Sequence, residues 1–188
     1  MLLNAGGVDS QDWSGALGQV TLVKVETIPL VEGDLRWVFP QLADPAEVLE
    51  VLLRADARMR RLADHLGVRP GWTGSGLEFW RYEHVTDIAG FAERGDVSFG
   101  LELWFPRTEL LKAPRRGPPW EVDAEISVRC NARRDCGSHT IEELPETQYA
   151  SPIAAAGGVL AAATWLLERG SAAPLSWWRE RDRRSGHP

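Results

Sequence analysis

Cysteine and histidine are both scarce in this chain, which has two and four of them among its 188 residues. So few cysteines cannot build the disulfide framework that small secreted domains use in place of a large core. So few histidines leave little material for general-base catalysis. The scarcity of both residue types argues against a disulfide-stabilised secreted domain and against most histidine-dependent enzymes.

The chain also lacks a long, strongly apolar segment. Its longest uncharged run, residues 147–167, begins with polar residues and proline and continues mainly with alanine and glycine. A helix that spans a bilayer needs roughly 20 strongly apolar residues, which this run does not supply. The first residues contain neither the basic region nor the apolar stretch of a signal peptide. We therefore expect a soluble, cytoplasmic protein without a membrane partner.

Several motifs that mark common enzymes are absent as well. The chain has no Walker motif, no dinucleotide-binding glycine pattern, no Gly-x-Ser-x-Gly elbow and no His-Glu-x-x-His sequence. Its formal net charge at pH 7 is -6, and an acidic protein repels the phosphate backbone of a nucleic acid. We therefore expect a protein without catalytic activity whose partner is not a nucleic acid.

What the chain does contain is the composition of an ordinary globular domain. Apolar residues make up 44% of the sequence and charged residues 26%. A chain of 188 residues is long enough to bury a sizeable core. We expect a single domain over residues 1–188, with a loose N-terminal tail over 1–18 and an irregular, charged C-terminal tail over 171–188.

Residues 95–130 show the clearest pattern, which is a strict alternation of apolar and polar side chains in two segments. A period of two is typical of a strand that buries one face. The two segments therefore predict a β-hairpin whose arms cover one core. The side chains expected to be buried are Val97, Phe99, Leu101, Leu103, Val122, Ala124, Ile126 and Val128.

Two segments have the pattern of amphipathic helices. In residues 45–66, apolar side chains recur at steps of three and four, after an Asp-Pro-x-Glu start and before Gly67 as the stop. The second helix is capped by Ser151, runs to about residue 169 and stops at Gly170. Both helices present an apolar stripe that must be buried against another element.

Further strands complete the predicted fold. They cover residues 19–28, 35–39, 77–84 and 139–144, while residues 86–94 are expected to hold one helical turn. Short connections between consecutive strands favour antiparallel neighbours, and helices then cover one face of the sheet. The predicted fold class is α+β, an antiparallel β-meander of about five to six strands with two main helices packed on one face.

The polar side of the predicted hairpin is acidic. In the register that pairs Phe105 with Trp120, Glu102 faces Asp123, and like charges in opposite positions destabilise a sheet. Such a face suits a basic partner, a bound cation or plain solvation, and an exposed tryptophan beside acids is typical of an interface. We expect a non-catalytic interaction module of an accessory or inhibitor kind, similar in charge and size to the immunity proteins of nuclease toxins. The residues expected to bind the partner are Glu102, Trp104, Glu121, Asp123 and Glu125.

A small-molecule-binding or enzymatic domain is the alternative function. Its pocket would lie between the sheet and the helices, where aromatic side chains can line a cavity. The candidate lining residues are Trp80, Tyr82, His84 and Trp104. A cavity of roughly a few hundred Å³ in that position would favour this alternative.

Cys130, Cys136 and His139 surround a predicted turn and leave three alternatives open. Thiolate and imidazole are preferred zinc ligands, but a closed site needs four ligands and these two cysteines are widely spaced. The cysteines could instead form a disulfide across the turn. Because a cytoplasm keeps thiols reduced, we expect no cofactor and treat the three residues as structural bystanders. Zinc binding is the second alternative function.

Overall fold

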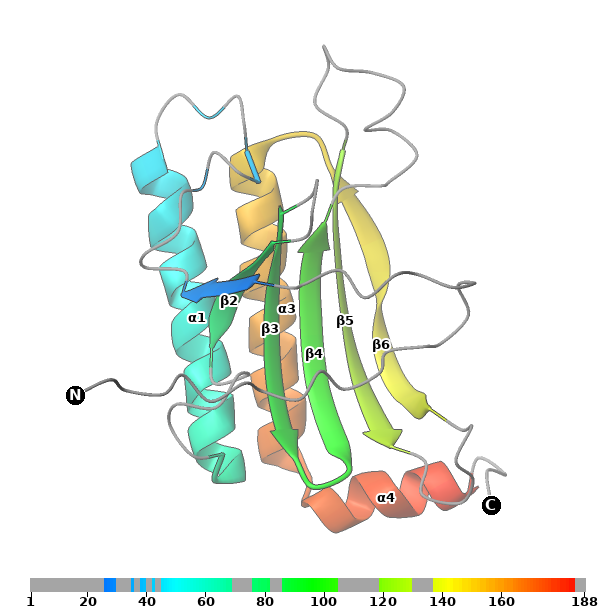
Figure 1. Ribbon diagram of the computed structural model, residues 1–188. Coiled ribbons are helices and arrows are strands. Elements are labelled where there is room, and N and C mark those ends of the chain that lie inside the picture. Colours follow the sequence, from blue (N-terminus) through cyan, green and yellow to red (C-terminus); the bar gives the residue numbers. More distant parts are fainter. Residues whose placement is uncertain are drawn as a thin grey trace, which may run out of the picture.

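The computed structural model describes residues 26–29, 35, 38–39, 42, 45–68, 76–81, 86–104, 119–129 and 137–184. Over these residues the structure has two layers, an antiparallel sheet and two helices that lie side by side on one of its faces (Figure 1). The strands are adjacent in the sheet in the same order as in the sequence. The predicted α+β meander with two main helices on one face is confirmed.

Six strands and three helices make up the described part of the chain. The strands are β1 (Glu26–Pro29), β2 (Leu77–Arg81), β3 (Thr86–Arg94), β4 (Val97–Trp104), β5 (Trp120–Arg129) and β6 (Ser138–Tyr149). The helices are α1 (Pro45–Leu66), α3 (Pro152–Ala172) and α4 (Leu175–Arg184). Helices α1 and α3 form the second layer, while α4 runs across one end of the sheet (Figure 1).

The core lies between the sheet and helices α1 and α3. Successive side chains of a strand point to opposite sides, so every second residue of β4 and β5 faces the helices. Helix α3 packs on β4 and β5, while α1 packs on α3 and β3. The hairpin side chains that the sequence predicts to be buried are all buried: Val97, Phe99, Leu101, Leu103, Val122, Ala124, Ile126 and Val128.

The C-terminal stop of α1 has the predicted form. Gly67 has a positive φ of 69°. Its N–H donates to the carbonyl of Asp64 at 3.0 Å, and the N–H of Val68 donates to the carbonyl of Ala63 at 2.9 Å. These two bonds are the Schellman motif, which ends a helix and favours glycine at the position with positive φ. The prediction of Gly67 as the stop is confirmed.

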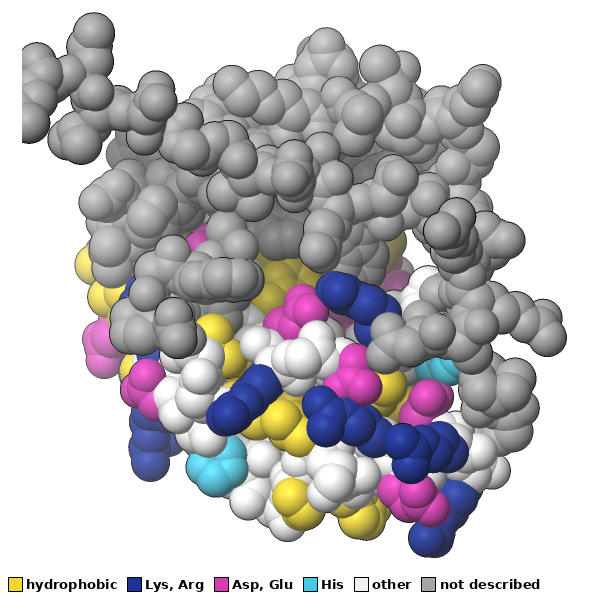
Figure 2. Space-filling view, turned by 60° about the horizontal axis from the view of Figure 1, so that its bottom comes forward, with side chains coloured by type: hydrophobic (Ala, Val, Ile, Leu, Met, Phe, Trp, Pro, Cys, Tyr) yellow, Lys and Arg dark blue, Asp and Glu magenta, His cyan; other side chains and the backbone are white. Residues whose placement is uncertain are grey.

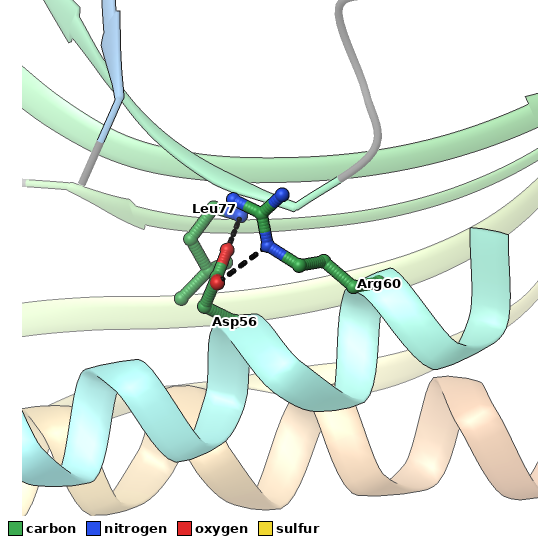
Figure 3. A network of polar contacts seen from close by, with 3 residues as sticks. All are labelled: Asp56, Arg60 and Leu77. Atoms are coloured by element: carbon green, nitrogen blue, oxygen red, sulfur yellow. Dashed lines mark hydrogen bonds and ion pairs between the residues drawn. The ribbon is translucent and has the colours of Figure 1, made fainter. Parts of the chain in front are cut away.

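Asp56 is a charged residue on the buried side of α1, and it is only 6% exposed. Its Oδ1 accepts a hydrogen bond from the N–H of Leu77 at 2.8 Å, and its Oδ2 accepts one from Nε of Arg60 at 2.7 Å (Figure 3). These partners offset the cost of burying a charge. Because Leu77 is the first residue of β2, the carboxylate also attaches the start of that strand to the helix.

Helix α3 begins as predicted but ends later. The Ser151 hydroxyl accepts a hydrogen bond from the N–H of Ala154 at 3.3 Å, which confirms the predicted N-cap. The prediction that Gly170 stops the helix is wrong, because α3 continues to Ala172. Gly170 is needed for packing instead: a Cβ on it would lie 2.4 Å from Cδ1 of Leu62 on α1. The glycine lets the two helices approach closely.

The described residues of the strand predicted over residues 35–39, which are Leu35, Val38 and Phe39, form a helical turn instead. The N–H groups of Val38 and Phe39 both donate to the carbonyl of Leu35, at 3.1 and 2.7 Å. The carbonyl of Val38 then accepts a hydrogen bond from the indole of Trp120 at 3.1 Å. The rings of Phe39 and Trp120 are 5.4 Å apart. Leu35, Val38 and Phe39 are therefore buried in a turn that packs on Trp120 at the start of β5. The sequence pattern alone does not distinguish such a turn from a strand.

The helical turn predicted over residues 86–94 is also wrong, because Thr86–Arg94 is strand β3. The alternation of apolar and polar side chains in β3 is weak, because several of its residues are small. Its core-facing positions include Gly90 and Ala92, and its opposite face includes Ala89, which is also buried. Pairing with β4 across a two-residue turn decides its structure, since Arg94 pairs with Val97.

The C-terminal segment expected to be irregular contains helix α4, which corrects that prediction. Its buried residue is Trp178, which is 1% exposed and meets the ring of Phe99 edge-on at 5.9 Å. Arginine and acidic side chains lie beside one another at this end of the molecule (Figure 2). Among them, Arg179 pairs with Asp96 and Arg181 pairs with Glu142. Tertiary contacts therefore hold a helix whose sequence is mostly charged. The tail expected over residues 1–18 lies outside the described residues.

Candidate functional site

The outer face of the sheet, which is the face away from α1 and α3, is hollowed where β3, β4, β5 and β6 run side by side. The hollow has a volume of about 370 Å³. We call it the acidic hollow, because five carboxylate side chains line it and no lining residue that the structure describes is basic. These side chains are Glu102, Asp123, Glu125, Glu143 and Glu146. The structure thus brings three of the five predicted partner-binding residues together at one concave site.

Gly100 and Phe91 supply an apolar part of the lining. Gly100 on β4 pairs with Phe91 on β3, and both residues line the hollow. A Cβ on Gly100 would lie 2.9 Å from Cε1 of Phe91, which is closer than side-chain carbons normally approach. The aromatic ring therefore lies against the glycine backbone. An apolar surface beside carboxylates suits a partner group with an aliphatic stem and a positive end.

One of the carboxylates, that of Glu146, comes from an irregular part of β6. The pairing of β6 with β5 shifts by one residue between Leu144 and Thr147. A bulge of this kind changes the direction of nearby side chains and often lies beside a functional site. Pro145 and Glu146 belong to this stretch, and both line the acidic hollow.

Carboxylates face each other across neighbouring strands in two places. Glu102 on β4 lies opposite Asp123 on β5, which confirms the predicted register. Glu125 on β5 lies opposite Glu143 on β6. Glu125 also accepts a hydrogen bond from the hydroxyl of Thr140 at 2.7 Å. Like charges in directly opposite positions of a sheet repel each other.

The ionisation of Asp123 reflects this crowding. Burial raises the pKa of Asp123 above the ordinary value for aspartate, and the negative charge of Glu125 raises it further. The side chain of Trp104 donates a hydrogen bond to Asp123, which acts in the opposite direction on the pKa. Trp104 is half-buried, and its hydrogen bond to Asp123 places it next to the hollow. Perturbed pKa values in a concave site are typical of functional residues.

Glu121, also predicted to bind the partner, lies beneath the surface. It is 4% exposed, and it does not line the hollow. Its Oε1 accepts a hydrogen bond from Nε2 of Gln148 at 2.6 Å. Burial raises the pKa of Glu121, and the neighbouring Glu146 raises it further through its charge and a hydrogen bond between the two side chains.

Phe91, Glu143 and Glu146 line the hollow but are not among the site residues predicted from the sequence. Phe91 was hidden because residues 86–94 were expected to be helical. The predicted last strand ended at Leu144, whereas β6 continues to Tyr149. A pair of acids before a proline, with a third acid after it, was the available signal for this part of the site.

The predicted zinc or disulfide site is only partly described. Cys130 and Cys136 lie outside the described residues, so their state stays a prediction. His139 is described: its Nδ1 lies 3.0 Å from Oδ1 of Asp182, and this contact joins β6 to α4. Among the residues that the structure describes, no three histidine, cysteine, aspartate or glutamate side chains are placed to hold a metal ion.

The aromatic pocket of the alternative function is also only partly described. Tyr82 and His84 lie outside the described residues, and only the backbone of Trp80 is described. Trp104 occupies a strand position on the outer face, opposite Glu121, and so points away from the helices. It therefore cannot line a pocket between the sheet and the helices.

No model of a protein family, no curated protein and no solved structure matches this chain. Within the described part of the chain, none of the helices is both long and apolar enough to cross a membrane. Function is therefore inferred from the residues and geometry of the acidic hollow rather than from relatives.

Proposed function

We propose that this chain is a non-catalytic protein-interaction module, of an accessory or inhibitor kind, that binds a basic partner at the acidic hollow. The observation that carries the proposal is the set of five carboxylates around one concave site of about 370 Å³. A hollow of this size receives one or two side chains rather than a whole domain. Lysine or arginine side chains on a protruding segment of the partner are the groups that fit its charge.

The energetic cost of the site supports a role in binding. Asp123 faces Glu102 on one side, and Glu125 faces Glu143 on the other. Folding alone gains nothing from such repulsion, and real proteins keep locally unfavourable arrangements mainly at functional sites. A cation in the hollow would relieve the repulsion on binding. Charge complementarity of this kind gives specificity and fast association.

Paired charge variants test the proposal. The chain is immobilised to capture a partner from the cells that produce it, and the partner is then purified and its affinity measured directly. Glu102→Gln with Asp123→Asn removes two charges and keeps the side-chain shapes, so we expect the affinity to fall by roughly tenfold or more. Glu168→Gln removes an exposed charge from α3, on the helical side, and should leave the affinity unchanged.

The urea unfolding curve of each variant is recorded alongside, so that lost affinity is compared only among folded proteins. The proposal fails if the captured partner is not basic, or if the double variant binds it as tightly as the wild type does.

A small cationic molecule is the second candidate for the same hollow. Its volume of about 370 Å³ falls within the range of small-ligand sites. Native mass spectrometry of the purified chain distinguishes the two candidates. A constant additional mass on the chain, with lower occupancy in Glu143→Gln, would favour the small ligand. A chain that carries no additional mass but binds a basic protein would favour the interaction module.

A further inference from the structure

A single row of residues crosses the acidic hollow from β3 to β6. The strand pairings place Phe91 on β3 opposite Gly100 on β4. Gly100 in turn lies opposite Glu125 on β5, and Glu125 lies opposite Glu143 on β6. All four residues line the hollow. Because neighbouring strands lie about 4.8 Å apart, the row presents an aromatic ring, a position without a side chain and two carboxylates at regular steps.

The missing side chain of Gly100 decides where the ring of Phe91 lies. A Cβ on Gly100 would be 2.9 Å from Cε1 and 3.1 Å from Cδ1 of Phe91. These two ring carbons therefore occupy the space that the side chain of any other residue would fill. Since Gly100 lies between Phe91 and Glu125 in the row, the ring leans toward that carboxylate. An aromatic surface and a carboxylate thus lie side by side in the hollow.

Further carboxylates are placed around the same point. Asp123 is two residues from Glu125 on β5, and Glu102 is two residues from Gly100 on β4. Residues two apart on a strand point to the same face and lie about 7 Å from each other. The carboxylate of Glu125 is also held in one orientation, because its Oε2 accepts a hydrogen bond from the hydroxyl of Thr140 at 2.7 Å. A group that lies on the ring therefore has carboxylates of two strands beside it.

We propose that the acidic hollow selects arginine over lysine, because a guanidinium group stacks on Phe91 while it pairs with the carboxylates. This inference rests on the proposed function and specifies the partner residue that enters the hollow. A guanidinium is planar and weakly hydrated, and it is the cation found most often over aromatic rings. Its parallel N–H groups also match the two oxygens of a carboxylate. The ammonium of lysine is a compact, strongly hydrated charge that lacks this planar geometry.

Two peptides of equal length and charge, hexaarginine and hexalysine, test the selectivity. Calorimetry at neutral pH and constant salt measures the affinity of the purified chain for each of them. We expect the wild-type chain to bind hexaarginine roughly three- to tenfold more tightly than hexalysine. Equal affinities would overturn the selectivity and leave the proposed function intact, whereas failure to bind either peptide would overturn both.

Two variants separate the ring from the charges. Phe91→Leu removes the ring and keeps a large apolar side chain, so the affinity for hexaarginine should fall roughly three- to tenfold, to that for hexalysine. Gly100→Ala keeps the ring and every carboxylate, but its methyl group needs the space of the ring, so we expect the same loss. Preference for hexaarginine in both variants would overturn the role of Phe91.

Glu143→Gln is the matched control, because it lines the hollow at the opposite end of the row from Phe91. It should weaken the binding of both peptides by the same factor and so keep the preference for hexaarginine. Loss of the preference in this variant would show that charge alone, without the ring, produces the selectivity, and this would contradict the inference.

A second measurement uses only the wild-type chain and does not depend on the folding of any variant. Nuclear Overhauser contacts in NMR spectra report protons that lie close together. We expect such contacts between the ring protons of Phe91 and the Cδ protons of bound hexaarginine. Binding of hexaarginine without these contacts would show that the guanidinium does not stack on Phe91 and would overturn the inference.

Discussion

The inner and outer faces of strands β4 and β5 are built by alternate residues of the same two segments, yet they carry different kinds of side chain. On the inner face, Leu101 and Ala124 are paired across the strands and are both 1% exposed. One step along, Glu102 and Asp123 are paired on the outer face and repel each other. The inner face stabilises the fold by burying apolar side chains, whereas the outer face places like charges opposite each other. The proposed function assigns stability to the inner face and binding to the outer face.

The largest expected effect tests the stabilising side. Leu101→Ala removes a side chain that is 1% exposed beneath α3, and we expect a loss of about 2–5 kcal/mol in the free energy of unfolding. Glu102→Gln, one residue further along, should change it by less than about 1 kcal/mol. Urea unfolding of both variants measures the difference. Similar losses for the two variants would mean that the faces do not differ as described.

The next effect concerns Asp56, the buried charge on the helical side, whose carboxylate is paired with the guanidinium of Arg60. Asp56→Ala leaves the N–H of Leu77 and the guanidinium of Arg60 without their acceptor. We expect a loss of about 1–3 kcal/mol, the cost of a broken buried hydrogen bond. Asp64→Ala, at an exposed position of the same helix, is the control and should cost less than about 0.5 kcal/mol. Thermal unfolding of the two variants measures the difference. Equal losses of stability would contradict the role of Asp56 in attaching β2 to α1.

A smaller effect, of opposite sign, is expected on the outer face. The pKa of Asp123 is raised in the folded state, so its charged form destabilises the fold at neutral pH. That destabilisation disappears as the pH falls through the raised pKa toward the unfolded value. Asp123→Asn should therefore stabilise the protein at neutral pH by roughly 0.2–1 kcal/mol, with the advantage shrinking on acidification.

Urea unfolding at several pH values measures this difference between the variant and the wild type. Glu143→Gln is a useful comparison, because its side chain is exposed and its stability difference should be smaller. A variant that is less stable than the wild type at neutral pH would show that Asp123 contributes to the fold and not only to the site.

The smallest expected effect lies beyond the end of β5, at Cys130 and Cys136. If they are structural bystanders, neither a chelator nor a reductant should change the melting temperature. Zinc binding would make chelation lower it, because the free energy of metal binding would be part of the folding free energy. A disulfide would make only the reductant lower it. Either shift would mean that a covalent or metal link, and not the inner face alone, stabilises the pairing of β5 with β6.

The structure was predicted correctly from the sequence where a strong pattern is compatible with only one arrangement of the strands. The alternation in β4 and β5 specifies which residues face the core, and a shift of one residue would expose them all, so the register follows. Prediction failed in β3, where Gly90 and Ala92 weaken the contrast between the faces. It also failed for Leu35 and Phe39, whose turn depends on the distant Trp120.

By itself, the sequence determined the fold class, the inner face, the stop of α1 at Gly67 and the acidic character of the outer face. These features depend on neighbours in the chain or on a period that a single segment already shows. Only the tertiary structure decided that Glu143 and Glu146 join Glu102 around one hollow, that Glu121 is buried and that α4 forms at all. Each of these depends on groups far apart in the sequence, on a bulge in β6 or on packing against another element, and no local pattern encodes such contacts.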